Sequence, residues 1–316
     1  SRPRSGRNMI LPDITHAIGN TPLVPLDRLT AHLGLTGRIL AKCDHLLPGF
    51  SKKDRAALAV IQAARASGTL KAGQTVVELT SGNMGTGLAI VCGLKGHPFV
   101  AVMSEGNSPE RAAMMRALGA EVVLVPQAEG AVAGEVSGAD LALVEAAAQA
   151  LTQERAAFRA DQFAHPSNPT AHETGTAPEI WEASEGTVTA FCDFVGSGGT
   201  LGGAARFLGP RGVACYALHP DTPNHPIQGG GYNMPTLAHL KGVPLAGNIT
   251  VTGDEARHHA RLLARFEGIF GGFSAGANLG GAVKLLAGPA KGGTVAIVIC
   301  DSGLKYLSTD LWKDAS

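Results

Sequence analysis

Charged side chains are scarce in this 316-residue chain, and the charges that are present balance. Asp, Glu, Lys and Arg together make up 16% of the residues, with 26 acidic against 26 basic side chains. This balance argues against the strongly basic surface by which proteins bind nucleic acids or anionic membranes. Aromatic residues reach only 5%, whereas glycine numbers 42 and aliphatic residues are abundant. The composition is typical of a tightly packed α/β enzyme.

Cysteine pairs, long apolar runs and a signal peptide are also missing. The five cysteines show no CxxC spacing and no Cys/His cluster, which argues against structural zinc and a disulfide framework. We therefore expect free thiols in a reducing compartment, and hence a cytoplasmic protein. No apolar run has the length of a membrane-spanning helix. Residues 1–8 are basic without an apolar core, and we expect them to be an expression remnant ahead of Met9.

Short β-branched runs alternate with alanine-rich helical stretches along the chain. The expected strands are 37–44, 75–80, 99–104, 121–126, 191–196, 214–220 and 294–300. Such alternation predicts parallel sheets with helices on both faces. At this length we expect two closely joined α/β lobes, the second beginning near residue 155. The stretch 128–150 is expected to hold a mobile loop followed by a helix.

Four glycine-rich turns follow expected strands or precede expected helices. They are SGNMGTG at 81–87, GSGGTLGG at 196–203, GGFSAGANLGG at 271–281 and CDSGLKYLSTDLW at 300–312. Glycines at a helix N-terminus expose backbone N–H groups that can bind a carboxylate or phosphate, although a single such turn is as easily a capped helix. The 196–203 turn has no P-loop lysine and fits GxGxxG poorly. Asp221 follows the next strand, so a dinucleotide site stays open as a weaker alternative.

These turns, together with the adjacent lysines of PGFSKKDRAAL (48–58), resemble the cysteine synthase and cystathionine β-synthase family of fold-type II pyridoxal-phosphate enzymes. Nine segments resemble family motifs in order: IGNTPLVPL (18–26), PGFSKKDRAAL (48–58), VELTSGNMGTGLA (77–89), MSEGNSPERAAMMRALGAEVVLV (103–125), DQFAHPSNPTAHETGTAPEIW (161–181), VGSGGTLGG (195–203), IQGGGYNMP (227–235), EGIFGGFSAGA (267–277) and DSGLKYLSTDL (301–311). The resemblance implies two doubly wound open-sheet lobes like those of tryptophan synthase β, with the cofactor between them. The smaller lobe would span 46–154 and carry the substrate-closing part. The larger, phosphate-binding lobe would combine 9–45 with 155–316.

The family motif Ser-x-Lys-Asp-Arg implies that Lys53 is the Schiff-base lysine and the general acid/base. Successive helical residues point about 100° apart, so only one of the two lysines reaches the ring from a given face. Lys52 is then a solvated surface lysine, or less commonly a positive charge over the substrate entrance. The remaining cofactor-binding residues implied by the resemblance are Asn83 at the ring hydroxyl, Ser274 at the ring nitrogen, and Gly196, Ser197, Gly198, Gly199 and Thr200 at the phosphate.

Substrate binding is implied by the same resemblance. The expected residues are Thr80, Ser81, Gly82, Met84, Gln162, Gly229 and Tyr232. Three features depart from the plain cysteine synthase pattern: Met84 replaces a threonine, Tyr232 follows a GGG run, and the 127–150 stretch is long. Tyr232 faces either the second substrate or the protein interior.

The resemblance implies β-replacement on an activated serine-type amino acid through an aminoacrylate, with sulfide, a thiol or an amine as nucleophile. A β-eliminating lyase or dehydratase that releases a keto acid and ammonia is the alternative, because both reactions use the same residues. A non-catalytic regulatory partner and a nicotinamide oxidoreductase are more distant alternatives. The expected partners are a small amino acid and a small nucleophile, with no nucleic acid, membrane or metal. A homodimer is implied by family likeness alone.

Overall fold

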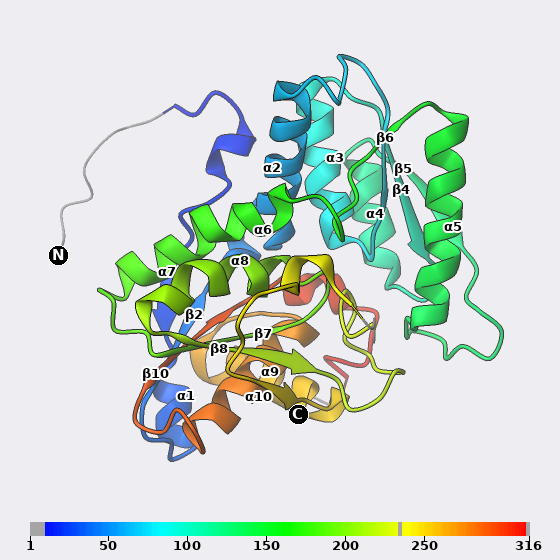
Figure 1. Ribbon diagram of the computed structural model, residues 1–316. Helices are drawn as coiled ribbons and strands as arrows, with labels where there is room; N and C mark the ends of the chain where they lie inside the picture. The colour runs from blue at the N-terminus through cyan, green and yellow to red at the C-terminus, as the bar shows by residue number, and fades with distance from the viewer. Residues whose placement is uncertain (1–9, 233–235, 314–316) are drawn as a thin grey trace.

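The computed structural model describes residues 10–232 and 236–313, whose strands form two sheets (Figure 1). The six-stranded sheet has the order β1-β2-β10-β7-β8-β9, and the four-stranded sheet has the order β5-β4-β3-β6. Each sheet has its own layer of helices on either face. The chain therefore folds as two α/β lobes, as the alternation of strands and helices predicts.

The larger sheet is parallel except at one edge. Its strands are β1 (Leu23–Pro25), β2 (Arg38–Lys42), β7 (Ala190–Phe194), β8 (Ala214–His219), β9 (Gly247–Thr250) and β10 (Thr294–Val298). Only β1 runs antiparallel to its neighbour, β2. The central strands are almost fully buried, because their apolar residues pack against helices on both faces.

One face of this sheet is covered by α1 (Asp27–His32), α9 (Gly253–Glu267) and α10 (Phe273–Leu286). The other face is covered by α7 (Ala177–Ala183) and α8 (Gly199–Leu208). A short helix, α6 (Ser167–Ala171), leads through a π-helical turn at His172–Thr176 into α7.

The smaller sheet is entirely parallel. Its strands are β3 (Val76–Leu79), β4 (Phe99–Ser104), β5 (Glu121–Val125) and β6 (Phe158–Arg159). One face packs against α2 (Lys53–Ala66), α3 (Asn83–Lys95) and α4 (Pro109–Ala117). The other face packs against α5 (Gly138–Glu154), which lies at the outer edge of the molecule in Figure 1.

The seven strands expected from sequence are all present, with ends that differ by one or two residues. Beyond residue 154, β6 pairs with β3 and extends the smaller sheet to Arg159. The 128–150 stretch holds the helix α5, which begins with a capping box between Ser137 and Asp140. Residues 1–8, expected to be an expression remnant, lie outside the described residues.

All five cysteines are buried and free, as expected. Within 10–232 and 236–313, no helix is long and apolar enough to cross a membrane. The same residues contain no group of three or more His, Cys, Asp or Glu side chains placed to hold a metal ion.

Candidate active site

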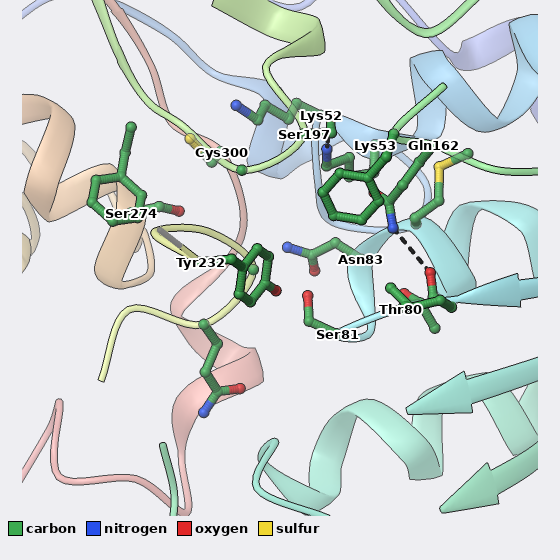
Figure 2. A pocket seen from close by; sticks show the side chains of 17 residues that line it. Lys52, Lys53, Thr80, Ser81, Asn83, Gln162, Ser197, Tyr232, Ser274 and Cys300 are labelled. Carbon is green, nitrogen blue, oxygen red and sulfur yellow. Dashed lines mark hydrogen bonds between the residues drawn. The ribbon is translucent and has the colours of Figure 1, made fainter. Parts of the chain in front are cut away.

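A cavity lies where the carboxyl ends of strands from both sheets face each other (Figure 2). The smaller lobe contributes the segment after β3 and the start of α2. The larger lobe contributes the segments after β7 and β10 and the loop around residue 229. The cavity is lined by Lys52, Lys53, Leu79, Thr80, Ser81, Asn83, Met84, Gln162, Phe163, Phe194, Gly196, Ser197, Gln228, Gly229, Tyr232, Ser274 and Cys300. Open α/β sheets commonly bind ligands beyond these strand ends.

Lys53 is the first residue of α2, and its amine points into the cavity toward the glycine turn after β7. Nζ lies 3.4 Å from Ser197 Oγ, a contact drawn in Figure 2. Burial and the positive charge of Lys52 lower the pKa of Lys53 from 10.5 to about 8. About a tenth of this amine is therefore neutral and nucleophilic at pH 7, far more than for an ordinary lysine.

Lys52 also lines the cavity, and the expectation that it is a solvated surface lysine is wrong. Its side chain is only 10% exposed and pairs with Asp193 of β7, with Nζ at 3.0 and 3.2 Å from the two carboxylate oxygens. Burial is the largest single effect and lowers the pKa of Lys52, but Asp193, together with Cys300 and Asp44, outweighs it and holds the pKa above its usual value. The cavity thus shifts the pKa values of the two lysines in opposite directions.

The glycine turn 196–200 joins β7 to α8 and can receive an anion. The first N–H groups of a helix have no partner within the helix, and here they belong to the start of α8. A Cβ on Gly196 would lie 2.5 Å from the carbonyl oxygen of Gly229, so only glycine permits this approach of the two loops. Gly198 has a φ of +80°, which also favours glycine.

The expected phosphate residues differ in their place around the cavity. Gly196 and Ser197 line it, whereas Gly198, Gly199 and Thr200 belong to the turn but not to the lining. The Thr200 hydroxyl is buried and lies 3.4 Å from His172 Nε2. Burial lowers the pKa of His172 well below its usual value, so the imidazole is neutral there.

The Asn83 amide is held between two polar partners. Its Nδ2 donates to Asp301 Oδ2 at 2.9 Å, and its Oδ1 accepts from Lys305 Nζ at 2.8 Å. Lys305 is anchored in turn by the carbonyl oxygen of Gly49 at 2.7 Å. These contacts fix which end of the amide is the donor, and one N–H of Nδ2 is left over to reach a ligand.

Ser274 opens α10 and faces the cavity from the side opposite the smaller lobe. Cys300 also lines the cavity, and burial raises the pKa of its thiol to about 12. Both side chains are therefore neutral. A ligand atom at Ser274 meets a hydroxyl rather than a charge.

The expected substrate residues of the smaller lobe lie around the start of α3. Thr80 Oγ1 accepts from the N–H groups of Gly82 and Gly85, each at 2.9 Å. Both lone pairs are then occupied, so the hydroxyl proton of Thr80 is free to be donated to a carboxylate. Gln162 donates from Nε2 to the carbonyl oxygen of Leu79 at 3.0 Å. Gly82 itself does not line the cavity, whereas Met84 and Ser81 do.

Tyr232 and Gly229 close the cavity from the larger lobe. Tyr232 and Ser81 both line the cavity, and the Tyr232 ring makes an edge contact with Phe163 at 6.3 Å between centroids. Tyr232 therefore faces the cavity while also packing against an aromatic neighbour. Residues 233–235 of the GGGYNMP motif lie outside the described residues.

Sequence reasoning missed several lining residues. They are Leu79, Phe163, Phe194, Gln228 and Cys300. Cys300 sits at the start of the fourth glycine-rich segment, and Gln228 precedes the GGG run, so their positions beside those motifs were the available signal.

Residues 14–301 match a family described as pyridoxal-phosphate dependent enzyme. The chain belongs to this family. A curated relative, cysteine synthase of Staphylococcus aureus (strain Mu50 / ATCC 700699), is 37% identical over 314 residues, which cover 95% of this chain and 97% of the relative.

Two solved structures of pyridoxal-phosphate family relatives resemble the fold closely. O-ureido-L-serine synthase superposes with a TM-score of 0.86 at 34% identity and covers 98% of this chain and 97% of its own. The O-acetylserine dependent cystathionine β-synthase from Helicobacter pylori gives a TM-score of 0.87 at 29% identity, with 96% and 99% covered.

The predicted family, fold and cofactor are thereby confirmed, and the chain is an enzyme of the cysteine synthase kind. The predicted β-replacement on serine derivatives is confirmed as a reaction class. The chemical groups that line the cavity fit pyridoxal phosphate. It combines an amine with a lowered pKa at Lys53, an anion-accepting glycine turn at Gly196, and a donor amide at Asn83.

Proposed function

We propose that this pyridoxal-phosphate enzyme replaces the leaving group of an O-acylated serine by a small nucleophile, and that Lys53 carries the cofactor. The observation that supports this most is the environment of Lys53, whose pKa is lowered to about 8 beside the glycine turn. The name of the Helicobacter pylori relative specifies O-acetylserine, and we take the acetyl ester as the first donor to test.

The other roles follow from the contacts in the cavity. The turn from Gly196 to Thr200 holds the phosphate, with Gly196 and Ser197 directly at the cavity wall. Asn83 donates to the ring hydroxyl, and Ser274 meets the ring nitrogen with an uncharged hydroxyl. When bound, pyridoxal phosphate supplies an electron sink for the substrate α-carbon.

The start of α3 binds the substrate carboxylate. Thr80 offers its hydroxyl proton, and the N-terminus of α3 at Asn83 and Met84 adds backbone N–H groups. Lys53 accepts the α-proton at Nζ, because the pKa of its amine is lowered to about 8 and the amine lines the same cavity. Gln162 completes the clamp through its amide.

We further propose that the smaller lobe closes over the substrate. Ser81 and Asn83 approach from the smaller lobe, and Gly229 and Tyr232 approach from the larger one, so a ligand in the cavity is held by both. A homodimer is proposed from family likeness, and a cytoplasmic location from the five free, buried cysteines. Sedimentation analysis of the purified protein tests the dimer, because the two states differ twofold in mass.

The decisive assay for the function uses the protein loaded with pyridoxal phosphate. It is given O-acetyl-L-serine alone and then with sulfide, a thiol or an amine, and both the new amino acid and keto acid are quantified. Lys53→Ala serves as the control. A new amino acid that requires the nucleophile supports replacement. Keto acid released at the same rate with or without nucleophile would show a β-eliminating lyase instead, and no turnover of any activated serine would contradict the proposal.

A further inference from the structure

We propose that Asp193 is a positioning residue that decides which of two adjacent lysines receives the cofactor. By pairing with Lys52, it keeps that amine out of the reaction and leaves Lys53 as the single attachment point. This inference rests on the proposed role of Lys53 and extends it to residues that do not touch the reacting atoms.

The need for such a choice arises from the position of the two lysines. Lys52 and Lys53 are neighbours at the start of α2, and both side chains line the same cavity. The Lys52 backbone N–H donates to the carbonyl oxygen of Cys300 at 2.8 Å, which fixes the backbone at this point. Proximity alone therefore does not select one amine over the other. Figure 2 shows both side chains beside Ser197.

Attachment requires a neutral amine. The lone pair of Nζ attacks the aldehyde carbon of pyridoxal phosphate, the carbonyl oxygen leaves as water with two protons, and a C=N bond forms. An ammonium group has no lone pair and cannot start this sequence. The protonation state of each lysine therefore decides which one reacts.

Asp193 holds Lys52 as an ammonium group in a well-built buried site. Its carboxylate is only 3% exposed and accepts from Lys52 Nζ through both oxygens. Asn278 Nδ2 donates to the same carboxylate at 3.1 Å. Asn278 is itself fixed by the N–H of Phe194 at 2.7 Å and the carbonyl oxygen of Val298 at 2.9 Å. The carboxylate therefore has little freedom to release Lys52.

The pair acts on Lys53 through the fixed charge of Lys52. That charge lowers the pKa of Lys53, and the carboxylate of Asp193 raises it to a smaller extent. Glu78 and Cys300 also raise the pKa of Lys53, and burial lowers it more than any of these charges changes it. The ion pair thus keeps Lys52 protonated, and the charge of Lys52 helps to lower the pKa of Lys53.

The test maps where the cofactor attaches. The full-length protein, Lys53→Ala and Lys53→Ala/Asp193→Asn are each loaded with pyridoxal phosphate between pH 7 and 9. The C=N bond is then reduced with borohydride, and the modified peptide is identified by mass spectrometry. We expect label at Lys53 in the unchanged protein and almost none at Lys52 in Lys53→Ala. In the double variant we expect label at Lys52 to rise about tenfold or more, since each unit of lowered pKa raises the neutral fraction about tenfold.

Two further variants keep the result interpretable. Lys53→Ala/Asp193→Ser removes the same carboxylate in case the Asn variant misfolds. Circular dichroism shows whether each variant keeps the fold of the unchanged protein. Lys52→Met/Lys53→Ala/Asp193→Asn should lose the label, which excludes Lys305, another buried lysine whose pKa is lowered to about 8.

Failure of the inference and failure of the proposed function give different results. Label elsewhere than Lys53 in the unchanged protein contradicts the proposed function. Suppose instead that the unchanged protein is labelled at Lys53, and that Lys53→Ala is labelled at Lys52 to the same level. This result overturns only the role of Asp193. So does the absence of transfer to Lys52 in both folded Asp193 variants.

Discussion

Arg111 of α4 reaches from the smaller lobe to Asp301, which follows β10 of the larger lobe, with Nη2 at 3.2 Å from Oδ2. Both side chains are fully buried. The same guanidinium donates to the carbonyl oxygen of Ser81 at 3.0 Å and to the Tyr306 hydroxyl. Asp301 is also the acceptor for Asn83. This contact therefore ties the two lobes together directly beside the cavity.

Substituting Arg111 by methionine should destabilise the protein strongly. The change leaves the Asp301 carboxylate buried without the Arg111 charge that pairs with it, which costs about 3–5 kcal/mol of the free energy of unfolding. Urea unfolding followed by circular dichroism measures the loss. Arg155→Met is the matched control, because Arg155 pairs with Glu121 where both side chains are substantially exposed, and it should cost less than about 1 kcal/mol. Equal losses in the two variants would contradict a structural role for the interlobe pair.

Gly82→Ala should destabilise the protein, because of the backbone conformation at Gly82 and the closeness of Arg111. Gly82 has a φ of +127°, and a Cβ there would lie 2.7 Å from Arg111 Cβ. We expect a loss of about 1–3 kcal/mol from strain and weaker binding of the substrate carboxylate at the start of α3. Gly93→Ala lies in the same helix with nothing near the added methyl, and should stabilise by about 0.5–1 kcal/mol. Thermal unfolding of both variants checks the contrast, and a Gly82→Ala protein as stable as Gly93→Ala would refute it.

The main features of this site can be predicted from sequence because they are local. A glycine-rich turn before a helix predicts the segments at Asn83, Gly196 and Ser274, the first two also after an expected strand, and all three line the cavity. The role of Lys52 could not be predicted, since its partner Asp193 lies 141 residues away in the chain. A lysine side chain is normally solvated, but pairing with a buried carboxylate allows Lys52 to lie in the protein interior.

The strands that sequence reasoning missed are short or lie at edges. β1 has three residues and β6 has two, which is too few for any periodicity to show. β9 alternates between half-buried and exposed residues at the edge of the larger sheet, so it lacks the apolar run that marks the central strands. Tertiary pairing, rather than local sequence, makes these segments strands.

The rate at which pyridoxal phosphate attaches to the cofactor-free protein should depend on pH with a midpoint near 8. The pKa of Lys53 is lowered to about 8 from 10.5, and only the neutral amine reacts. The rate should therefore rise about tenfold per pH unit below the midpoint and level off above it. Stopped-flow absorbance between pH 6 and 10 measures this profile. A midpoint near the ordinary lysine value would show that the cavity does not lower the pKa of Lys53.

Tyr232→Phe should weaken substrate binding without unfolding the protein. It removes a hydroxyl from a side chain that lines the cavity and keeps the ring against Phe163. Loss of one hydrogen bond of about 0.5–1.5 kcal/mol predicts a KM for the amino acid raised about two- to tenfold. Tyr216→Phe, in β8 and outside the lining of the cavity, should leave KM unchanged. Steady-state kinetics on both variants measure these KM values. The same KM in Tyr232→Phe as in Tyr216→Phe would mean that the Tyr232 hydroxyl has no part in binding.

The most direct test of Lys53 as the cofactor lysine is the visible absorption spectrum of the protein loaded with pyridoxal phosphate, compared with those of Lys53→Ala and Lys52→Met. The C=N bond to Lys53 should give a visible band in the unchanged protein and in Lys52→Met, and no such band in Lys53→Ala. A band that survives in Lys53→Ala and disappears in Lys52→Met would contradict this assignment.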